Sequence, residues 1–315
     1  MNSTFNKYFH QPVMVNKVIE ALDCEPGKVY VDCTVGGAGH SVLIAQKIKP
    51  DGKLICLDVD QNAIDEATNN LKSFNNVYIL RLNHLNLPQV LNQVGVDKID
   101  GGVLMDLGAS YYQLTSPDKG FTFQCSSRLD MRMDETLITS AEDLVNNLSA
   151  EELAEIFWKY GEERHSRKIA SAISNYSKKE KITDTLQLAE IIKTAIPGYK
   201  KYKIHPATRT FQALRIFINK ELEVLEGSLS NLISLTSPGA KIVVITFHSL
   251  EDRIVKNFFK HWSKDCVCPS EMIECRCNHK KKLKIITKKP IVPDNNELEC
   301  NPAARSSKLR IAERV

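Results

Sequence analysis

The stretch that decides the fold is Val29-Tyr-Val-Asp-Cys-Thr-Val-Gly-Gly-Ala-Gly-His40, followed after a helix-length gap by Leu54-Ile-Cys-Leu-Asp58-Val-Asp60. A β-branched run that ends at Asp32, then three glycines within four residues, predicts a strand, a tight loop and the start of a helix. A second strand then ends at Asp58. A carboxylate at that place can accept hydrogen bonds from the ribose hydroxyls of an adenosine-containing cofactor. The stretch therefore predicts either a nicotinamide dinucleotide or S-adenosylmethionine as ligand.

The spacing of the glycines separates these two cofactors. A dinucleotide-binding loop needs its third glycine three residues after the second, whereas Gly39 is followed by His40, Ser41 and Val42. The carboxylate of Asp32 would repel a pyrophosphate but suits a ligand with an ammonium and a sulfonium. S-adenosylmethionine is therefore favoured. A glycine-rich turn without any ligand is the structural alternative.

Composition places the chain among globular proteins with a sizeable core. It has 315 residues, 43% of them hydrophobic, which suits one large domain or two smaller ones. An odd count of nine cysteines, with no apolar leader before Tyr8, argues against a disulfide framework. No apolar stretch approaches the roughly 20 residues that span a bilayer. A soluble, cytoplasmic protein is expected, with no membrane partner.

Positive charge is concentrated towards the C-terminus. The net charge is only +4, yet residues 211–315 hold 18 Lys and Arg against 12 Asp and Glu. The excess is densest from Lys260 to Pro290, which includes Lys280-Lys-Lys282. Such a patch suits a polyanionic partner such as RNA, and a solvated surface is the alternative.

The N-terminal third alternates predicted strands and helices. Strands are expected at 29–32, 54–58, 77–80 and 102–106, with helices at 41–48 and 62–72. This rhythm predicts an α/β fold with a doubly wound parallel sheet, whose ligands bind at the carboxyl ends of the strands.

A run of helices interrupts that rhythm after Asp106. Ser149-Ala-Glu-Glu152 is a capping box, and helices are expected at 164–177 and 185–196. A single long helix is predicted from Ala207 through Leu229, and then a strand at 242–246. Ser249-Leu-Glu-Asp252 is expected to cap the next helix, with Ser249 as the N-cap. The predicted organisation is an α/β domain made of 1–112 and 205–315, with an inserted helical domain at 113–204 that recognises the substrate.

Eight motifs appear in order along the chain. They are Tyr8-Phe-His-Gln-Pro-Val-Met14, Asp32-Cys-Thr-Val-Gly-Gly-Ala-Gly-His40, Asp106-Leu-Gly-Ala-Ser110, Leu129-Asp-Met-Arg-Met-Asp134, Tyr160-Gly-Glu-Glu-Arg164, His205-Pro-Ala-Thr-Arg-Thr-Phe-Gln-Ala-Leu-Arg215, Phe247-His-Ser-Leu-Glu-Asp-Arg253 and Asn301-Pro-Ala-Ala-Arg-Ser306. Together they resemble the bacterial ribosomal RNA small subunit methyltransferase H family, also called MraW. The resemblance implies a class I S-adenosylmethionine-dependent methyltransferase that modifies the exocyclic N4 of one cytidine in 16S rRNA, near the decoding centre at the P site. It also allows a homodimer.

The resemblance implies a set of cofactor-binding residues. They are Gly37, Ala38, Gly39, His40, Asp58, His84, Asp106 and Gln113. Two departures from the family pattern occur: His84 stands where Phe is usual beside the adenine, and Tyr111-Tyr112 replace a Ser-Pro pair. An imidazole can still stack on adenine, and a surface loop histidine is the alternative for His84.

Methyl transfer to the cytosine amine needs an acceptor that aligns this amine, because its lone pair is delocalised into the ring. Asp106, at the end of the fourth predicted strand, is the candidate catalytic residue, and cofactor binding alone is its alternative role. Six residues in polar motifs are candidates for binding the substrate, with helix capping or internal ion pairing as alternatives. They are His205, Arg209, His248, Ser249, Arg253 and Arg305.

Two C-x-C pairs, Cys266-Val-Cys268 and Cys275-Arg-Cys277, lie in the basic region beside His279. Four thiolates could hold a structural zinc ion, although the spacing is shorter than in the usual zinc ribbon. Reduced thiols on a basic loop are the alternative, and no metal is assigned to the active site.

Two other function classes are alternatives to the methyltransferase. A nicotinamide-dependent dehydrogenase is disfavoured by the glycine spacing and by Asp32. A non-catalytic RNA-binding ribosome assembly factor would keep the basic region without needing Asp58 or Asp106.

Overall fold

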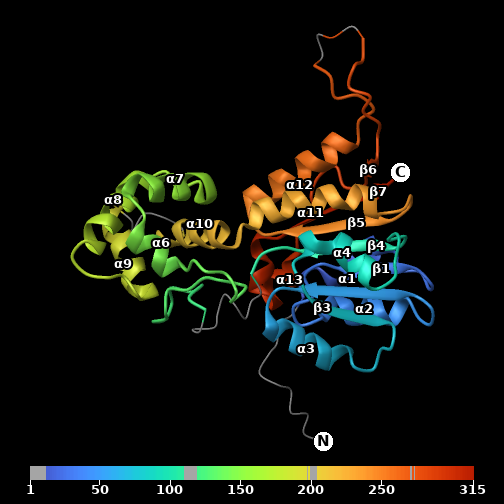
Figure 1. Cartoon of the computed structure of the whole chain (residues 1–315), viewed down its shortest axis with the longest axis horizontal. Coiled ribbons are helices and arrows are strands. Elements are labelled where there is room, and N and C mark those ends of the chain that lie inside the picture. Colours follow the sequence, from blue (N-terminus) through green and yellow to red (C-terminus); the bar gives the residue numbers. More distant parts are fainter. Residues whose placement is uncertain (1–11, 110–118, 197, 199–203, 270–271, 273) are drawn as a thin grey trace, which may run out of the picture. The chain divides into compact units, whose positions relative to one another are not determined.

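The chain forms two compact units in a computed structural model, which describes residues 12–109, 119–196, 198, 204–269, 272 and 274–315. The first, here called the α/β unit, is made of 1–108 and 222–315. The second, called the helical unit, is 109–221. Figure 1 colours the helical unit in green and yellow tones.

A seven-stranded sheet forms the α/β unit, in the order β3-β2-β1-β4-β5-β7-β6. The strands are β1 (Val29–Asp32), β2 (Lys53–Asp58), β3 (Val77–Arg81), β4 (Gly102–Asp106), β5 (Lys241–Thr246), β6 (Leu283–Ile285) and β7 (Lys308–Arg314). Neighbours among β1 to β5 pair in parallel, while β7 runs antiparallel to β5 and β6. β4 and β5 pair directly although the helical unit separates them in the chain. The predicted parallel sheet is confirmed, with an antiparallel pair at one edge.

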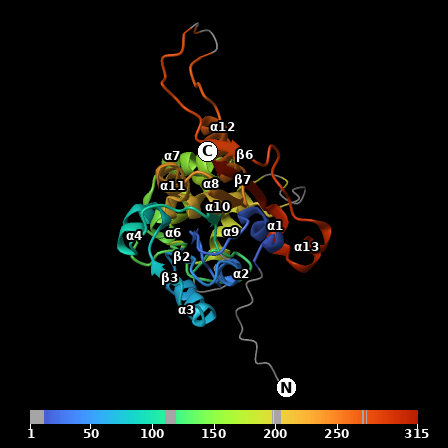
Figure 2. The same cartoon turned by 90° about the vertical axis from the view of Figure 1, so that its right-hand side faces the viewer.

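Helices cover both faces of this sheet, as Figures 1 and 2 show. α1 (Val15–Leu22), α2 (Gly39–Lys47) and α3 (Gln61–Leu71) pack on one face, and α4 (Leu87–Gln93), α11 (Glu221–Leu235) and α12 (Ser249–Trp262) on the other. Successive β2 residues point to opposite faces, so Leu54 and Cys56 join one core and Ile55 and Leu57 the other. Burial on both faces explains the continuous apolar run of this strand.

Capped helices form the helical unit. They are α6 (Ala141–Asn147), α7 (Ala150–Gly161), α8 (Ser166–Ser177), α9 (Thr185–Ala195) and α10 (Ala207–Asn219). The capping box predicted at Ser149 and Glu152 is confirmed, and Ser140 with Asp143 forms a second one. α7 buries Leu153 and Phe157 where it packs against α8 and α10.

The single long helix predicted from Ala207 is wrong. The chain breaks at Lys220, whose φ of 50° and ψ of 37° are left-handed, and this residue separates α10 from α11. α10 and α11 each bury one apolar face, so apolar residues continue at helical spacing across the break. The spacing alone therefore does not indicate the turn at Lys220. The division between the units falls after Glu221, not at 204/205, and α10 therefore belongs to the helical unit.

Short elements complete the α/β unit. They are the 3-10 turn η1 (His84–Asn86), α13 (Asn295–Cys300) and the 3-10 turn η3 (Pro302–Ser306). Among the described residues, no helix is long and apolar enough to cross a membrane.

Candidate active site

Three aspartates end neighbouring parallel strands at the same edge of the sheet. Asp32 ends β1, Asp58 ends β2 and Asp106 ends β4, and β1 lies between the other two. The carboxyl edge of a doubly wound sheet is where such folds bind their ligands. The candidate site is therefore built around these three carboxyl groups.

The glycine loop between β1 and α2 turns through left-handed backbone. Gly36 has φ +47°, and Ala38, the N-cap of α2, has φ 62° and ψ 21°. A Cβ on Gly39 would lie 2.6 Å from the Cγ of Pro12, so glycine is needed there for close packing. The amide of Asn70 donates to the carbonyl oxygen of Gly37 at 3.0 Å and holds the loop against α3.

Asp58 is fixed from both sides by backbone amides. The N–H of Gly36 donates to Oδ2 and the N–H of Asp60 to Oδ1, each at 3.0 Å. Burial raises the pKa of Asp58 to about 6, so the carboxyl group is mostly ionised at neutral pH. Each carboxylate oxygen can accept a further hydrogen bond. Asp58 therefore fits the ribose-binding role that the sequence predicts.

Asp32 has partners within the protein on both oxygens. The hydroxyl of Ser41 donates to Oδ2 at 2.6 Å and the N–H of Thr34 to Oδ1 at 3.2 Å, and the residue is 1% exposed. Burial raises its pKa to about 6. Thr34 in turn accepts the N–H of Asp106 at 2.7 Å through Oγ1. Asp32 thus orders the loop and, through Thr34, the end of β4.

Thr34 and Ser41 are positioning residues that are not among the predicted site residues. The spacing Asp32-x-Thr34 is typical of a turn in which an aspartate accepts the amide two residues later, and it could have indicated Thr34. Nothing local indicates Ser41, which reaches Asp32 from the next element.

Asp106 carries an unsatisfied oxygen. Its side chain is 13% exposed, and Oδ1 is buried with no hydrogen-bond partner among the described residues. Burial, reinforced by the charges of Asp32 and Glu251, raises the pKa of Asp106 well above its usual value. Buried polar atoms in folded proteins are nearly always paired. An unpaired carboxyl oxygen at this edge of the sheet marks a place for a donor from a ligand.

The His40 side chain lies beside Asp106. Nε2 donates to the carbonyl oxygen of Val13 at 3.0 Å, and Nδ1 lies 4.0 Å from Oδ2 of Asp106. Burial lowers the pKa of His40 to about 4, so the ring is neutral at neutral pH. Because a carbonyl only accepts, Nε2 carries the proton and Nδ1 presents a lone pair towards the carboxyl group.

His84 begins η1, just after β3. Its Nδ1 lies 2.6 Å from Oγ of Ser228 on α11, and burial lowers its pKa to about 4. The ring is therefore neutral and held in one orientation, and its stacking on adenine stays a prediction. Gln113 and the Tyr111-Tyr112 pair lie outside the described residues.

The cap of α12 differs from the prediction. The N-cap is His248, whose Nδ1 accepts the N–H of Glu251 at 3.4 Å, while Glu251 accepts the N–H of Phe247 at 2.8 Å. Ser249 is instead the first residue of the helix. Histidine is an uncommon N-cap, whereas serine is a common one. The sequence pattern therefore predicted the N-cap at Ser249, one residue after the observed one.

Glu251 is a functional candidate that no local sequence pattern indicates. It is 2% exposed, its charge raises the pKa of Asp106, and a Cβ on Gly108 would lie 4.0 Å from its Oε1. The Nε2 of His248 lies 3.1 Å from Oε1 without the alignment of a hydrogen bond. Arg253 is exposed on α12.

The remaining predicted substrate residues have contacts of their own. In the helical unit, the ring of His205 stacks on Phe123 at 4.6 Å, and Arg209 donates from Nη1 to the carbonyl oxygen of Glu162 at 3.1 Å. The Nδ1 of His205 also accepts the N–H of Ala207 at 3.2 Å. In the α/β unit, Arg305 is exposed on η3. A role in binding the substrate stays a prediction for each of them.

Sheet order, glycine loop and acidic strand ends together define a class I S-adenosylmethionine-dependent methyltransferase. Comparison with known proteins gives the family. The model of the MraW methylase family matches residues 7–315. Two curated relatives, from Finegoldia magna and Carboxydothermus hydrogenoformans, are both called "Ribosomal RNA small subunit methyltransferase H". The first is 45% identical over 98% of this chain and 99% of its own length, and the second is 46% identical over the same shares.

This chain belongs to the MraW methylase family. It is a methyltransferase, and its cofactor is S-adenosylmethionine.

Proposed function

We propose that this enzyme methylates the exocyclic N4 of one cytidine in 16S ribosomal RNA, near the decoding centre at the P site. The observation that carries the proposal is the buried Oδ1 of Asp106 at the end of β4, which has no hydrogen-bond partner among the residues that the structure describes. It lies at the same edge of the sheet as Asp58. The name shared by the relatives, ribosomal RNA small subunit methyltransferase H, supports the choice of substrate.

The residues at the strand ends fit the cofactor. Asp58 would accept the ribose hydroxyls, the loop from Gly37 to His40 would hold the methionine end, and His84 would lie beside the adenine. S-adenosylmethionine supplies a methyl group on a sulfonium, which needs no metal ion. A positive ligand would also favour the ionised form of Asp106, whose pKa is raised by burial in the protein alone.

Asp106 performs the chemistry that the cytosine amine requires. Its carboxylate oxygen accepts a hydrogen bond from the N4 amine, which fixes the amine in line for transfer and compensates for the developing positive charge. As the N–C bond forms and the C–S bond of the methyl donor breaks, the same oxygen accepts the proton that N4 gives up. Glu251 adds negative charge nearby, and Gly108 leaves room where a side chain would approach Phe247 at 3.6 Å. Neutral His40 keeps a lone pair towards Asp106 and therefore adds no competing cation.

A stacked base cannot enter such a site unless it is extruded from the RNA. The helical unit is proposed to recognise the folded RNA around the target, with His205 and Arg209 among its contacts. The residues His248, Ser249, Arg253 and Arg305 would do so from the α/β unit. Because its substrate is ribosomal, the enzyme is placed in the cytoplasm.

The test is to incubate small ribosomal subunits that lack the modification with labelled S-adenosylmethionine and to identify the modified nucleoside. We expect N4-methylcytidine with the native enzyme. Asp106→Asn should lower the turnover at least 100-fold, because the amide presents a donor or a weaker acceptor to the amine. Asp65→Asn, an exposed carboxylate on α3, is the control and should keep full turnover.

Three results would contradict the proposal. Another methylated nucleoside would refute the cytidine N4 assignment. Near-normal turnover of Asp106→Asn with unchanged cofactor affinity would refute the role of Asp106. An RNA-binding assembly factor without catalysis would show subunit binding but no labelled product.

A further inference from the structure

The described residues between α12 and β6 project away from the sheet in both views of Figures 1 and 2. The segment between these two elements carries the two C-x-C pairs, Cys266-Val-Cys268 and Cys275-Arg-Cys277. All four cysteines are free thiols. Neither the methyltransferase site nor its chemistry uses them.

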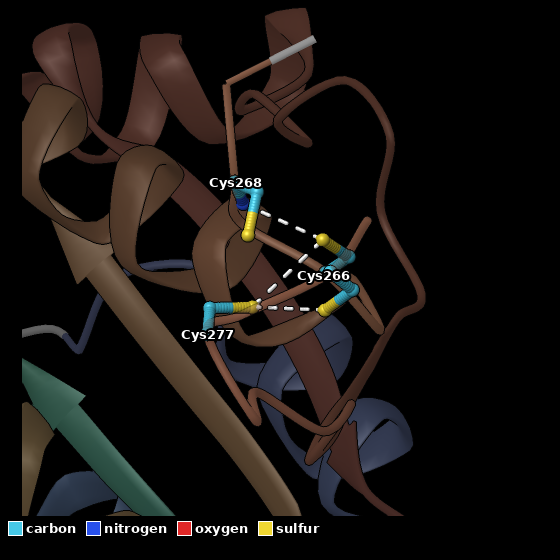
Figure 3. Close-up of side chains that lie close together, drawn as sticks. Cys266, Cys268 and Cys277 are labelled. Atoms are coloured by element: carbon cyan, nitrogen blue, oxygen red, sulfur yellow. Dashed lines mark hydrogen bonds between the residues drawn. The ribbon is translucent and has the colours of Figure 1, made fainter. Parts of the chain in front are cut away.

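The fold brings the four sulfur atoms into one cluster. The Sγ atoms of Cys266, Cys268, Cys275 and Cys277 all lie within 4.8 Å of one another. Cys277 Sγ is 3.6 Å from Cys275 Sγ and 3.8 Å from Cys266 Sγ, and Figure 3 shows Cys277 and Cys266 pointing towards each other. Four thiolates at about 2.3 Å from a tetrahedral zinc ion lie about 3.8 Å apart. The distances between the sulfur atoms are therefore close to those in a Cys₄ zinc site.

The described residues of the projecting segment form no hydrophobic core that could hold this arrangement. Between Trp262 and Leu283, none of the residues that the structure describes is buried. Small structures of this kind fold only with another source of stability, such as a disulfide or a metal ion. Each pair has one exposed and one half-buried cysteine. A metal ion that binds all four thiols would explain why they lie together without apolar packing.

The base of the segment holds the two arms side by side. The N–H of Lys282 donates to the carbonyl oxygen of Trp262 at 2.8 Å, and the rings of His261 and His279 are 4.7 Å apart. Nε2 of His279 lies 3.2 Å from the carbonyl oxygen of His261. His279 is thus part of this base, and the four sulfurs complete the ligand set without it.

Backbone amides point at the sulfur atoms. The N–H of Val267 donates to Sγ of Cys277 at 3.5 Å, and the N–H of Cys268 to Sγ of Cys266 at 3.4 Å. Such second-layer hydrogen bonds orient thiolate ligands and stabilise their charge. A zinc ion with four thiolates carries a net charge of −2, which the neighbouring Arg276 and Lys280-Lys-Lys282 offset.

We propose that Cys266, Cys268, Cys275 and Cys277 bind one zinc ion that holds the segment between α12 and β6 in its fold. Each thiol gives up its proton to solvent as its sulfur–zinc bond forms, so no oxidant is needed. Four protein ligands leave no open position, which makes the site structural and not catalytic. Softness of the thiolates favours zinc over magnesium or calcium.

The proposal is tested on the full chain, purified under reducing conditions and dialysed against metal-free buffer. Elemental analysis should find one zinc per chain. Cys266→Ser with Cys277→Ser should reduce the zinc to background, whereas Cys300→Ser, an exposed cysteine outside the cluster, should keep it. Replacement of zinc by cobalt should give thiolate-to-cobalt charge-transfer bands and the intense visible absorption of a tetrahedral site, both absent from the double variant.

Folding is checked separately by the circular dichroism and melting temperature of the double variant, which should match the native chain because the cluster lies outside both sheet cores. A reduced native chain that neither retains nor rebinds zinc would overturn the proposal. So would an iron cluster, a disulfide between these cysteines in the freshly isolated protein, or equal zinc content in the double variant and the native chain.

Discussion

The three aspartates at one edge of the sheet differ in the hydrogen-bond partners of their carboxyl oxygens. Asp32 has a serine hydroxyl and a backbone amide, Asp58 has two backbone amides, and Asp106 keeps one oxygen unpaired among the described residues. Burial raises the pKa of all three. The unpaired oxygen distinguishes the proposed reacting group from the residues that position the loop.

The raised pKa of Asp32 predicts that the stability of the folded protein depends on pH. Its pKa is about 6 in the fold against an ordinary 3.8, so between these values the folded state binds more protons than the unfolded chain. This group therefore favours folding at acid pH and loses that contribution as the pH rises through about 6. Two units of pKa correspond to about 3 kcal/mol.

Asp32→Asn should remove this dependence. The free energy of unfolding of the variant, relative to the native chain, should increase by about 2.5 kcal/mol between pH 4 and pH 7. Urea titrations at several pH values measure the difference. The comparison with the native chain cancels the opposite contributions of His40 and His84, whose lowered pKa values make stability rise with pH in the same range. A difference independent of pH would contradict the assignment.

At the scale of elements, the break between α10 and α11 depends on one residue. Lys220 holds a left-handed conformation that costs a residue with a side chain roughly 1 kcal/mol, while glycine adopts it freely. The ion pair of Arg215 and Glu221, 2.9 Å long, stabilises the turn from both sides. The helix ends here because the turn is stabilised locally, although the apolar pattern continues.

Lys220→Gly should therefore raise the free energy of unfolding by up to about 1 kcal/mol. Lys220→Ala is the matched control, because alanine keeps the cost of the left-handed backbone and should give no gain. Urea denaturation of the three proteins measures the effect. Equal stability of the glycine and alanine variants would show that the turn is not strained.

At the scale of the whole molecule, the C-terminal excess of basic residues is a candidate surface for RNA. Each lysine that neutralises a phosphate makes binding more salt-dependent, with a slope near −0.7 to −0.9 per contact in log–log form. With zinc bound as proposed, the segment between α12 and β6 would hold Lys280, Lys281 and Lys282 in a fixed arrangement. Their contribution depends on the proposed ribosomal substrate.

Reversal of these charges, K280E/K281E/K282E, should weaken binding to small subunits and reduce the salt slope by about 2. The control K47E/K49E/K72E changes the net charge equally at exposed positions elsewhere on the α/β unit and should leave the slope nearly unchanged. Filter binding over a range of salt concentrations measures both. Identical slopes for the two variants would place the RNA contacts away from the segment.

Much of the fold could be predicted because its signals are local. Strand ends at Asp32, Asp58 and Asp106, the glycine loop and the capping box at Ser149 were all visible in short windows of sequence. The cap at His248 and the break at Lys220 could not be predicted, because side-chain reach and backbone conformation decide them and apolar spacing does not.

The sequence by itself determined the class of sheet, the place of the glycine loop and the family, since periodicity, glycine spacing and ordered motifs are properties of the chain alone. Only the tertiary structure decided which carboxylate has an oxygen without a partner in the described part of the chain, that Glu251 raises the pKa of Asp106, and that four cysteines meet in one cluster. The physical reason is that burial and pairing depend on residues far apart in the sequence, which only the folded chain brings together.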